Sequence, residues 1–223
     1  MLQNNTVKFL KDLKKNNNKP WFDANRMRYD EARKDFEIFI QLLIDKHGKK
    51  DKSIAELKAK ECMFRINRDI RFAKDKTPYK INMSASIGRG GKKSLFASYY
   101  FQLEPSGESL ICGGLWAPMP PELKKVRQEI DYNFDDLQKI ISNKKFKTVF
   151  KDLYKGEDAT LIKVPQGFEK DNPAADYLKL KSFIAIKPLK DIDLTSKDLE
   201  KNILEAMEAA QPFVEFINRS IED

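Results

Sequence analysis

The period of the apolar residues changes along this chain, and that change limits the folds open to it. Toward both ends apolar residues recur every three to four positions, as at Phe36, Ile40 and Leu43, which is typical of amphipathic helices. In the middle, LFASYYFQLE (95–104) and SLICGGLW (109–116) flank EPSGE, which predicts a β-hairpin. Helices that flank a group of strands, rather than alternate with strands, indicate an α+β fold.

We therefore expect a single α+β domain over residues 1–223, with a mostly antiparallel sheet packed against N-terminal and C-terminal helices. The expected helices cover residues 5–15, 20–47, 120–131, 133–142 and 143–153, with a final long helix after the capping signal of Thr195 and Asp198. The expected strands cover residues 62–72, 81–88, 95–104, 109–116 and 183–187. Gly113 and Gly114 predict a bulge or a close backbone approach.

Residues 62–80, CMFRINRDIRFAKDKTPYK, form the most unusual stretch. From Cys62 to Phe72 apolar residues fall at every second position, which predicts a strand with polar residues on its other face. Arg68 interrupts this pattern, so either the strand ends near Asn67 and turns, or Arg68 is buried with a partner. A buried guanidinium without a partner costs roughly several kcal/mol, so a carboxylate or a bound anion is expected beside it. The nearest carboxylates in the sequence are those of Asp69 and Asp75.

The same stretch is strongly basic and suggests an anion site. Arginine presents a planar fork that fits phosphate or carboxylate, whereas lysine acts as a mobile point charge. Asp69 and Asp75 would orient the cations or serve as a base or metal ligand, and Tyr79 would donate a proton or a hydrogen bond. An Arg–Asp network that only ties a strand to a loop is the structural alternative. The expected ligand-binding residues are Arg65, Arg68, Arg71, Lys76 and Lys80.

The spacing of this stretch resembles the signature of a bacterial family catalogued as domain of unknown function 2461. The matching positions are Arg65, Arg68-Asp69, Arg71-Phe72, Asp75-Lys76 and Tyr79. Residues 9–33, 113–130 and 177–189 are also similar to the family. The resemblance implies a single bacterial domain of this length and no established activity. Many members carry His where this chain has Asn82, so if that His transfers a proton in relatives, this chain lacks the group.

The net charge of +8 is concentrated in one segment. Residues 46–93 hold 15 Lys or Arg against five Asp or Glu, and a local excess of this kind favours an anionic partner. Three functions stay open. The first is binding of a small phosphate-bearing or other anionic ligand, with or without a reaction on it. The second is nucleic-acid binding, for which the basic loop GRGGKKS and the aromatic run 99–101 are typical. The third is a non-catalytic scaffold in which the Arg–Asp motif is a structural lock.

The residue pattern identifies no cofactor and gives no support to a zinc site or a membrane span. His47 is the only histidine, and Cys62 and Cys112 lack the CxxC spacing of a metal site, so we expect no metal and two buried thiols. No apolar run reaches about 18 residues, and no secretory segment opens the chain. We expect a cytoplasmic protein with no membrane partner.

Overall fold

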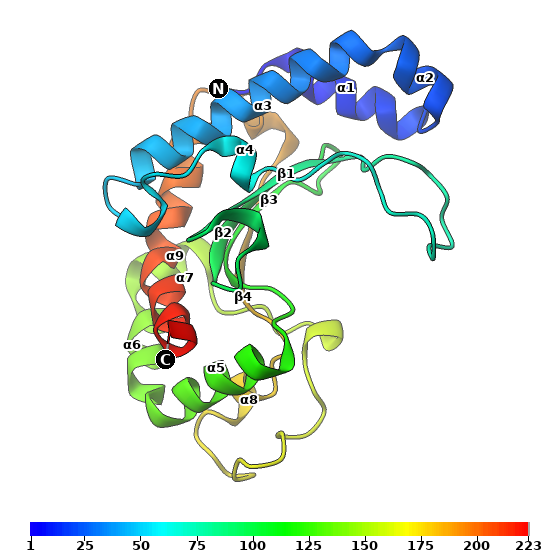
Figure 1. The fold of residues 1–223 in the computed structure, drawn as a ribbon. Coiled ribbons are helices and arrows are strands. Elements are labelled where there is room, and N and C mark those ends of the chain that lie inside the picture. The colour runs from blue at the N-terminus through cyan, green and yellow to red at the C-terminus, as the bar shows by residue number, and fades with distance from the viewer. Residues whose placement is uncertain (223) are drawn as a thin grey trace. The chain divides into compact units, whose positions relative to one another are not determined.

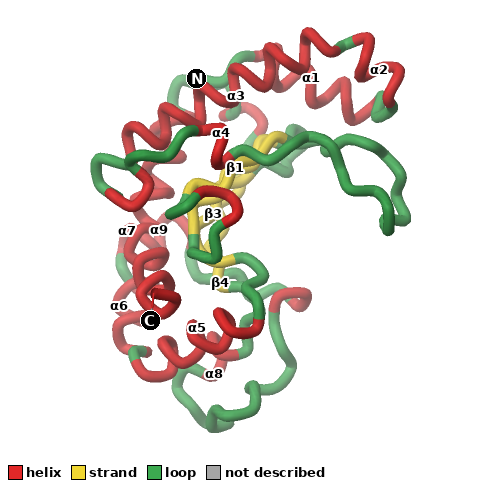
Figure 2. The backbone as a smooth tube through the Cα atoms, viewed as in Figure 1, coloured by secondary structure: helices red, strands yellow, loops and turns green. Residues whose placement is uncertain are grey.

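The computed structural model describes residues 1–222, which form helices around one four-stranded sheet (Figures 1 and 2). The helices are α1 (Asn4–Lys15), α2 (Lys19–Ala24), α3 (Arg26–His47), α4 (Ala59–Cys62), α5 (Pro120–Tyr132), α6 (Phe134–Ser142), α7 (Lys144–Phe150), α8 (Ala175–Leu178) and α9 (Leu199–Glu222). The strands are β1 (Met83–Ile87), β2 (Ser98–Leu103), β3 (Leu110–Leu115) and β4 (Phe183–Pro188), antiparallel in the order β1-β2-β3-β4. The predicted α+β class, with helices at both ends, is confirmed.

The chain divides into two compact units. Unit 1 consists of Met1–Lys92, Tyr100–Ile111 and Pro188–Glu205. Unit 2 consists of Lys93–Tyr99, Cys112–Lys187 and the residues from Ala206 onward. The single domain expected over residues 1–223 stays a prediction. No helix within residues 1–222 is both long enough and apolar enough to cross a membrane.

The core of unit 1 forms on the apolar stripe of α3. Phe36, Ile40 and Leu43 are fully buried there, as their helical spacing predicts. Phe101 of β2 is also fully buried, and its ring lies 5.8 Å from that of Phe36. Aromatic side chains of α1 and α2 extend this core, and the Phe9 ring lies 6.4 Å from that of Phe22. One face of the sheet is therefore covered by α3 in this unit.

The helix predicted over residues 20–47 is interrupted. It is two helices, α2 and α3, because the backbone leaves the helical conformation at Asn25 (φ −110°, ψ 20°). The Asn25 side chain donates a hydrogen bond to the Trp21 carbonyl, 2.9 Å away, and so takes up an acceptor at the end of α2. The break turns the short α2 away from the axis of α3 (Figure 1).

The strand predicted over residues 62–72 is wrong. Cys62 ends α4, and Met63 pairs with Ala85 in an isolated bridge. The alternating pattern does not mark a buried face, since Phe64 is 38% exposed and Phe72 is 95% exposed. The segment is instead a long loop that leaves the sheet and returns to β1 (Figure 2).

Unit 2 packs α5, α6 and α7 with the C-terminal part of α9. The Phe146 ring meets that of Phe213 edge to face at 6.1 Å. The predicted close approach at the two glycines is confirmed in this unit. A Cβ on Gly113 would lie 2.4 Å from the Ala210 side chain, and one on Gly114 would lie 2.0 Å from the Phe183 carbonyl.

Candidate functional site

The basic signature lies on a loop of unit 1 that we call the arm, residues 64–82. Its two limbs are tied by backbone hydrogen bonds from the Arg68 amide to the Pro78 carbonyl (2.9 Å) and from the Lys80 amide to the Ile66 carbonyl (2.7 Å). Residues 69–77 close the arm at its tip. The arm runs out from the start of β1 and comes back to it (Figure 1). Cations that are close in sequence are therefore distributed along a hairpin-like loop.

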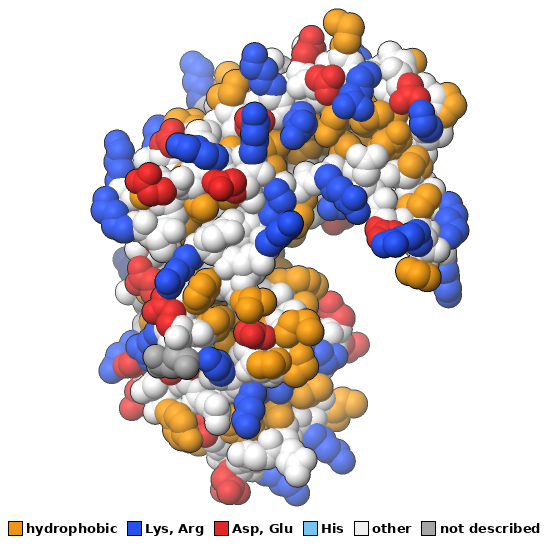
Figure 3. Space-filling view, in the orientation of Figure 1, with side chains coloured by type: hydrophobic (Ala, Val, Ile, Leu, Met, Phe, Trp, Pro, Cys, Tyr) orange, Lys and Arg blue, Asp and Glu red, His pale blue; other side chains and the backbone are white. Residues whose placement is uncertain are grey.

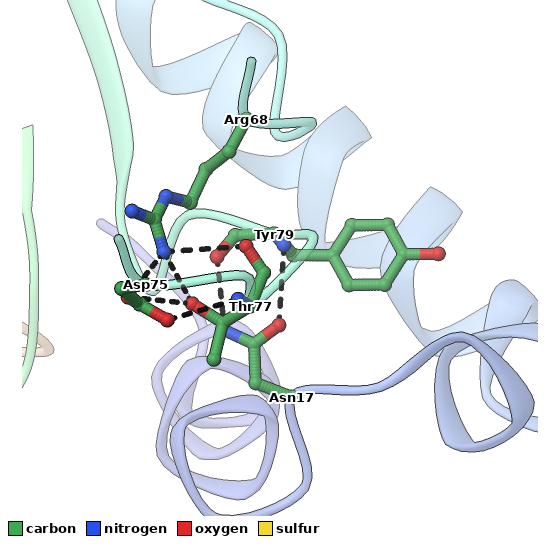
Figure 4. Close-up of polar contacts among 5 residues, drawn as sticks. All are labelled: Asn17, Arg68, Asp75, Thr77 and Tyr79. Atoms are coloured by element: carbon green, nitrogen blue, oxygen red, sulfur yellow. Dashed lines mark hydrogen bonds and ion pairs between the residues drawn. The ribbon is translucent and has the colours of Figure 1, made fainter. Parts of the chain in front are cut away.

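Arg68 is held by a cluster at the turn of the arm (Figure 4). Its guanidinium forms an ion pair with Asp75 at 2.5 Å and also donates to the hydroxyl and carbonyl of Thr77. The Thr77 amide donates to Asp75 at 2.9 Å, as does the Thr77 hydroxyl. The Thr77 amide and the Arg68 guanidinium lower the pKa of Asp75 from its ordinary 3.8 to about 2. Asp75 is therefore the carboxylate that was expected beside Arg68.

Tyr79 and Asn17 anchor the arm to the turn between α1 and α2. The Tyr79 amide donates to the Asn17 side-chain oxygen at 3.1 Å, and the Asn17 amide donates to the Tyr79 carbonyl at 2.9 Å. The Tyr79 ring is buried and stacks on Phe22, with centroids 3.9 Å apart. Its hydroxyl points away from Arg68 and Asp75 (Figure 4). The structure does not bring this hydroxyl to the cluster.

The tip of the arm is organised by a second set of contacts. Arg71 pairs with Asp69 through two guanidinium nitrogens, at 2.9 and 2.6 Å, and this contact lowers the pKa of the Asp69 carboxyl. The Lys76 ammonium donates to the Ile70 carbonyl at 3.0 Å. Phe72 is 95% exposed at this point. Basic, acidic and hydrophobic side chains lie side by side at the tip (Figure 3).

Arg65 and Lys80 differ from the cations above because neither forms an ion pair, although the charge of Arg65 contributes to the lowered pKa of Asp69. Within residues 1–222 neither side chain forms an ion pair or a side-chain hydrogen bond. The Lys80 ammonium lies 5.2 Å from the centre of the Phe64 ring. Partial burial, and then the positive charge of Arg65, lower the pKa of Lys80. No carboxylate offsets these two effects at Lys80, so the base of the arm carries positive charge that no ion pair neutralises.

A small hollow lies between α3, the start of β1 and the base of the arm, and it is lined by Phe64 but not by Arg65 or Lys80. Its walls include Tyr29, Arg33, Phe64 and Asn82. Arg33 also has no ion pair with any of the residues that the structure describes. The hollow encloses about 10 Å³, which is room for a single water-sized group. A ligand would therefore lie on the rim of the hollow and place at most one small group inside it.

Asn82 contacts a polar network at the end of β2. Its amide donates to Glu104 at 2.9 Å, and the Gln102 amide donates to the same carboxylate oxygen at 3.0 Å. The Tyr100 hydroxyl donates to the Gln102 side chain at 2.9 Å. A side chain at position 82 is therefore placed against a carboxylate, and in this chain that side chain is an amide with no titrating proton.

The residues predicted from the sequence thus separate into three groups. Arg68 and Asp75 meet at the turn of the arm, and Arg71 and Asp69 meet at its tip with Lys76. Arg65 and Lys80 share the base of the arm. Tyr79 belongs to the anchor rather than to any of these groups.

Sequence reasoning missed two residues, Asn17 and Arg33. No local pattern around Asn17 indicates its role, because its contact with Tyr79 spans 62 positions. Arg33 had a usable signal, because it lies one helical turn after Tyr29 on the edge of the stripe of α3. No group of three or more His, Cys, Asp or Glu within residues 1–222 could hold a metal ion.

The fold and site define an α+β protein with a basic arm. Ion pairs hold the arginines at its turn and tip, and the cations at its base form no ion pair within residues 1–222. The chain belongs to the family described as conserved hypothetical protein (DUF2461), whose model matches residues 5–216. This covers the arm, the whole sheet and all the helices except the first residue of α1 and the end of α9. No curated protein and no solved structure matches the chain.

Proposed function

We propose that the protein binds a phosphate-bearing anion at the base of the arm, through Arg65, Lys80 and Arg33. The observation that carries this proposal is that none of these three cations forms an ion pair within residues 1–222. Arg33 lines the hollow, and the Lys80 ammonium lies 5.2 Å from the ring of Phe64, which lines it too. The charge of Arg65 in turn acts on Lys80. Positive charge that is left uncompensated, and partly desolvated at Lys80, favours an anion from solution. Arginine would supply paired donors and lysine a point charge.

The contacts of the other cations support a structural role instead. Arg68 and Arg71 already bind Asp75 and Asp69, and Lys76 already binds a backbone carbonyl. The proposal therefore retains Arg65 and Lys80 from the five expected ligand residues and adds Arg33.

The proposal is binding without a reaction. Asp75, with a pKa of about 2, is ionised at neutral pH and is a weak base, and Asp69 shifts in the same direction. Tyr79 lies in the anchor, with its ring against Phe22. None of these three groups is placed beside the uncompensated cations as a proton donor or acceptor.

Titration calorimetry with inorganic phosphate, nucleoside monophosphates, sugar phosphates and carboxylates tests the proposal. Charge-assisted hydrogen bonds contribute about 1.5–3 kcal/mol each, so Lys80→Gln or Arg65→Gln should weaken the best ligand by about 10- to 100-fold. Arg71→Gln is the matched control, because Arg71 is exposed and already paired with Asp69. Equal losses in Arg71→Gln and Lys80→Gln, or no binding of any anion in the panel, would overturn the proposal.

A further inference from the structure

We infer that the phosphate bound at the base of the arm belongs to a single-stranded nucleic acid, and that its bases stack on the exposed aromatic rings of the arm. This inference rests on the function proposed above and names its ligand class. It begins from Phe72, whose ring is 95% exposed at the tip. A single exposed apolar side chain is common on protein surfaces, but an exposed ring within a strongly basic segment offers a face on which a base can stack.

The tip is built to hold this ring in place. The Arg71–Asp69 pair and the bond from Lys76 to the Ile70 carbonyl close the backbone on both sides of Phe72. The Arg71 guanidinium lies 5.9 Å from the centre of the Phe72 ring. An aromatic face next to a cation suits a unit that combines a flat ring with a negative charge, and a nucleotide is such a unit.

A second exposed ring lies at the other end of the arm. Phe64 is 38% exposed and lies between the Lys80 ammonium, at 5.2 Å, and the Tyr100 ring, at 6.3 Å. The arm thus carries an aromatic ring beside a cation at each end. The basic residues that lie between or beside the two rings are Arg65, Arg68, Arg71, Lys74, Lys76 and Lys80.

The spacing of the two rings favours a polymer over a small ligand. Phe64 and Phe72 are eight positions apart, so their backbones are separated by at most roughly 29 Å. The backbone-bonded pairs Ile66–Lys80 and Arg68–Pro78 lie along the arm between the two rings, so a single nucleotide does not contact both. A strand of several nucleotides can, and sites of about 4–16 nucleotides are usual for this mode of binding. A membrane-docking loop would instead gather its apolar residues at the tip, and here the second ring is at the base.

Fluorescence anisotropy with labelled single-stranded DNA and RNA of about eight nucleotides tests the inference, with inorganic phosphate and a mononucleotide as competitors. Phe72→Ala should weaken oligonucleotide binding by about 5- to 100-fold, the range seen when one stacking ring is removed. It should leave inorganic phosphate binding unchanged. Ile192→Ala, which removes another exposed apolar side chain of unit 1, should change neither.

The outcomes separate the two proposals. If the oligonucleotide binds no more tightly than inorganic phosphate, or if Phe72→Ala behaves like Ile192→Ala, the inference is wrong and the anion site stands. If neither phosphate nor oligonucleotide binds, both proposals are wrong. Vesicles that contain an anionic lipid form a third arm of the test. Binding to them that is lost in Phe72→Ala, without oligonucleotide binding, would replace the nucleic acid with a membrane surface.

Discussion

At the scale of single residues, Asp75 shows the larger pKa shift of the two carboxyls of the arm. Its pKa is about 2, below the ordinary 3.8, because the Thr77 amide and then the Arg68 guanidinium favour the ionised carboxylate. A carboxyl whose pKa is lower in the folded state stabilises the fold above its unfolded pKa. That contribution is lost as the pH falls from about 4 through about 2.

We predict that carboxyl-detected NMR titration gives a pKa near 2 for Asp75, and that Arg68→Gln raises this value toward 3.8 without reaching it. The rise is partial because the Thr77 amide, which is the larger cause, stays in place. The arm should also loosen in the wild-type protein between pH 4 and pH 2, roughly over this window. A wild-type pKa near 3.8 would contradict the contacts described here.

Asn17 is the second residue on which the arm depends. Asn17→Ala removes both hydrogen bonds to the Tyr79 backbone, and each contributes about 0.5–1.5 kcal/mol net. We predict a loss of about 1–3 kcal/mol in the free energy of unfolding from urea denaturation, together with faster hydrogen exchange at the Tyr79 amide.

A matched variant makes this prediction specific. Asn17→Asp keeps an acceptor for the Tyr79 amide, but it replaces the donor to the Tyr79 carbonyl with a carboxylate oxygen. Its amide exchange should stay slow. Equally fast exchange in Asn17→Ala and Asn17→Asp would show that the side-chain oxygen does not hold this amide.

The contacts of some of these residues could be predicted from the sequence because the two partners lie close together in the chain. Arg68 interrupts an apolar pattern and demands a partner, and one of the two nearest carboxylates, Asp75, supplies it. The anchor was not predictable in this way, since Asn17 and Tyr79 meet only through the fold. Which cations of the arm form ion pairs also depends on the path of the backbone, so it could not be predicted from the sequence either.

At the scale of elements, long residue patterns predicted secondary structure more accurately than short ones. The stripe of α3 repeats over several turns, and the hairpin of β2 and β3 has a turn signal between its strands, so each is specified by many residues. The pattern over residues 62–72 is short and is interrupted by Arg68. Its backbone pairs only at isolated positions, including the bridge of Asn67 with Tyr79. Tertiary anchoring therefore decided the structure of the arm.

The two glycines of β3 lead to an element-scale prediction. Gly114 has φ +132°, and a Cβ there would lie 2.0 Å from the Phe183 carbonyl on the neighbouring strand. We predict that Gly114→Ala lowers the free energy of unfolding by about 3 kcal/mol or more, through backbone strain and overpacking together.

Gly107→Ala is the control for this effect, because Gly107 also has a positive φ (+84°) but has nothing within 4 Å of the added Cβ. It should cost only about 1–2 kcal/mol, the strain alone. Urea denaturation of both variants measures the difference. Similar losses at the two positions would show that β4 yields to the added methyl group.

At the scale of the whole molecule, the two compact units raise the question of whether they unfold together. The chain passes repeatedly from one unit to the other, and β2, β3, β4 and α9 each include residues of both. Neither unit is a continuous stretch of sequence that could be cut out with its elements intact. Unfolding one unit would remove part of every element that continues into the other.

We therefore predict one cooperative unfolding transition, in keeping with the single domain expected from the sequence. Pulsed hydrogen exchange with mass spectrometry, at increasing urea concentrations, can follow peptides from α3 in unit 1 and from α6 in unit 2. The two sets of peptides should lose protection at the same urea midpoint and with the same slope.

Gly114→Ala, which perturbs only residues of unit 2 directly, sharpens the comparison. It should lower the midpoint of the α3 peptides as much as that of the α6 peptides, because stability is shared in a cooperative unit. A shift confined to α6 would show instead that the chain contains two independently stable domains.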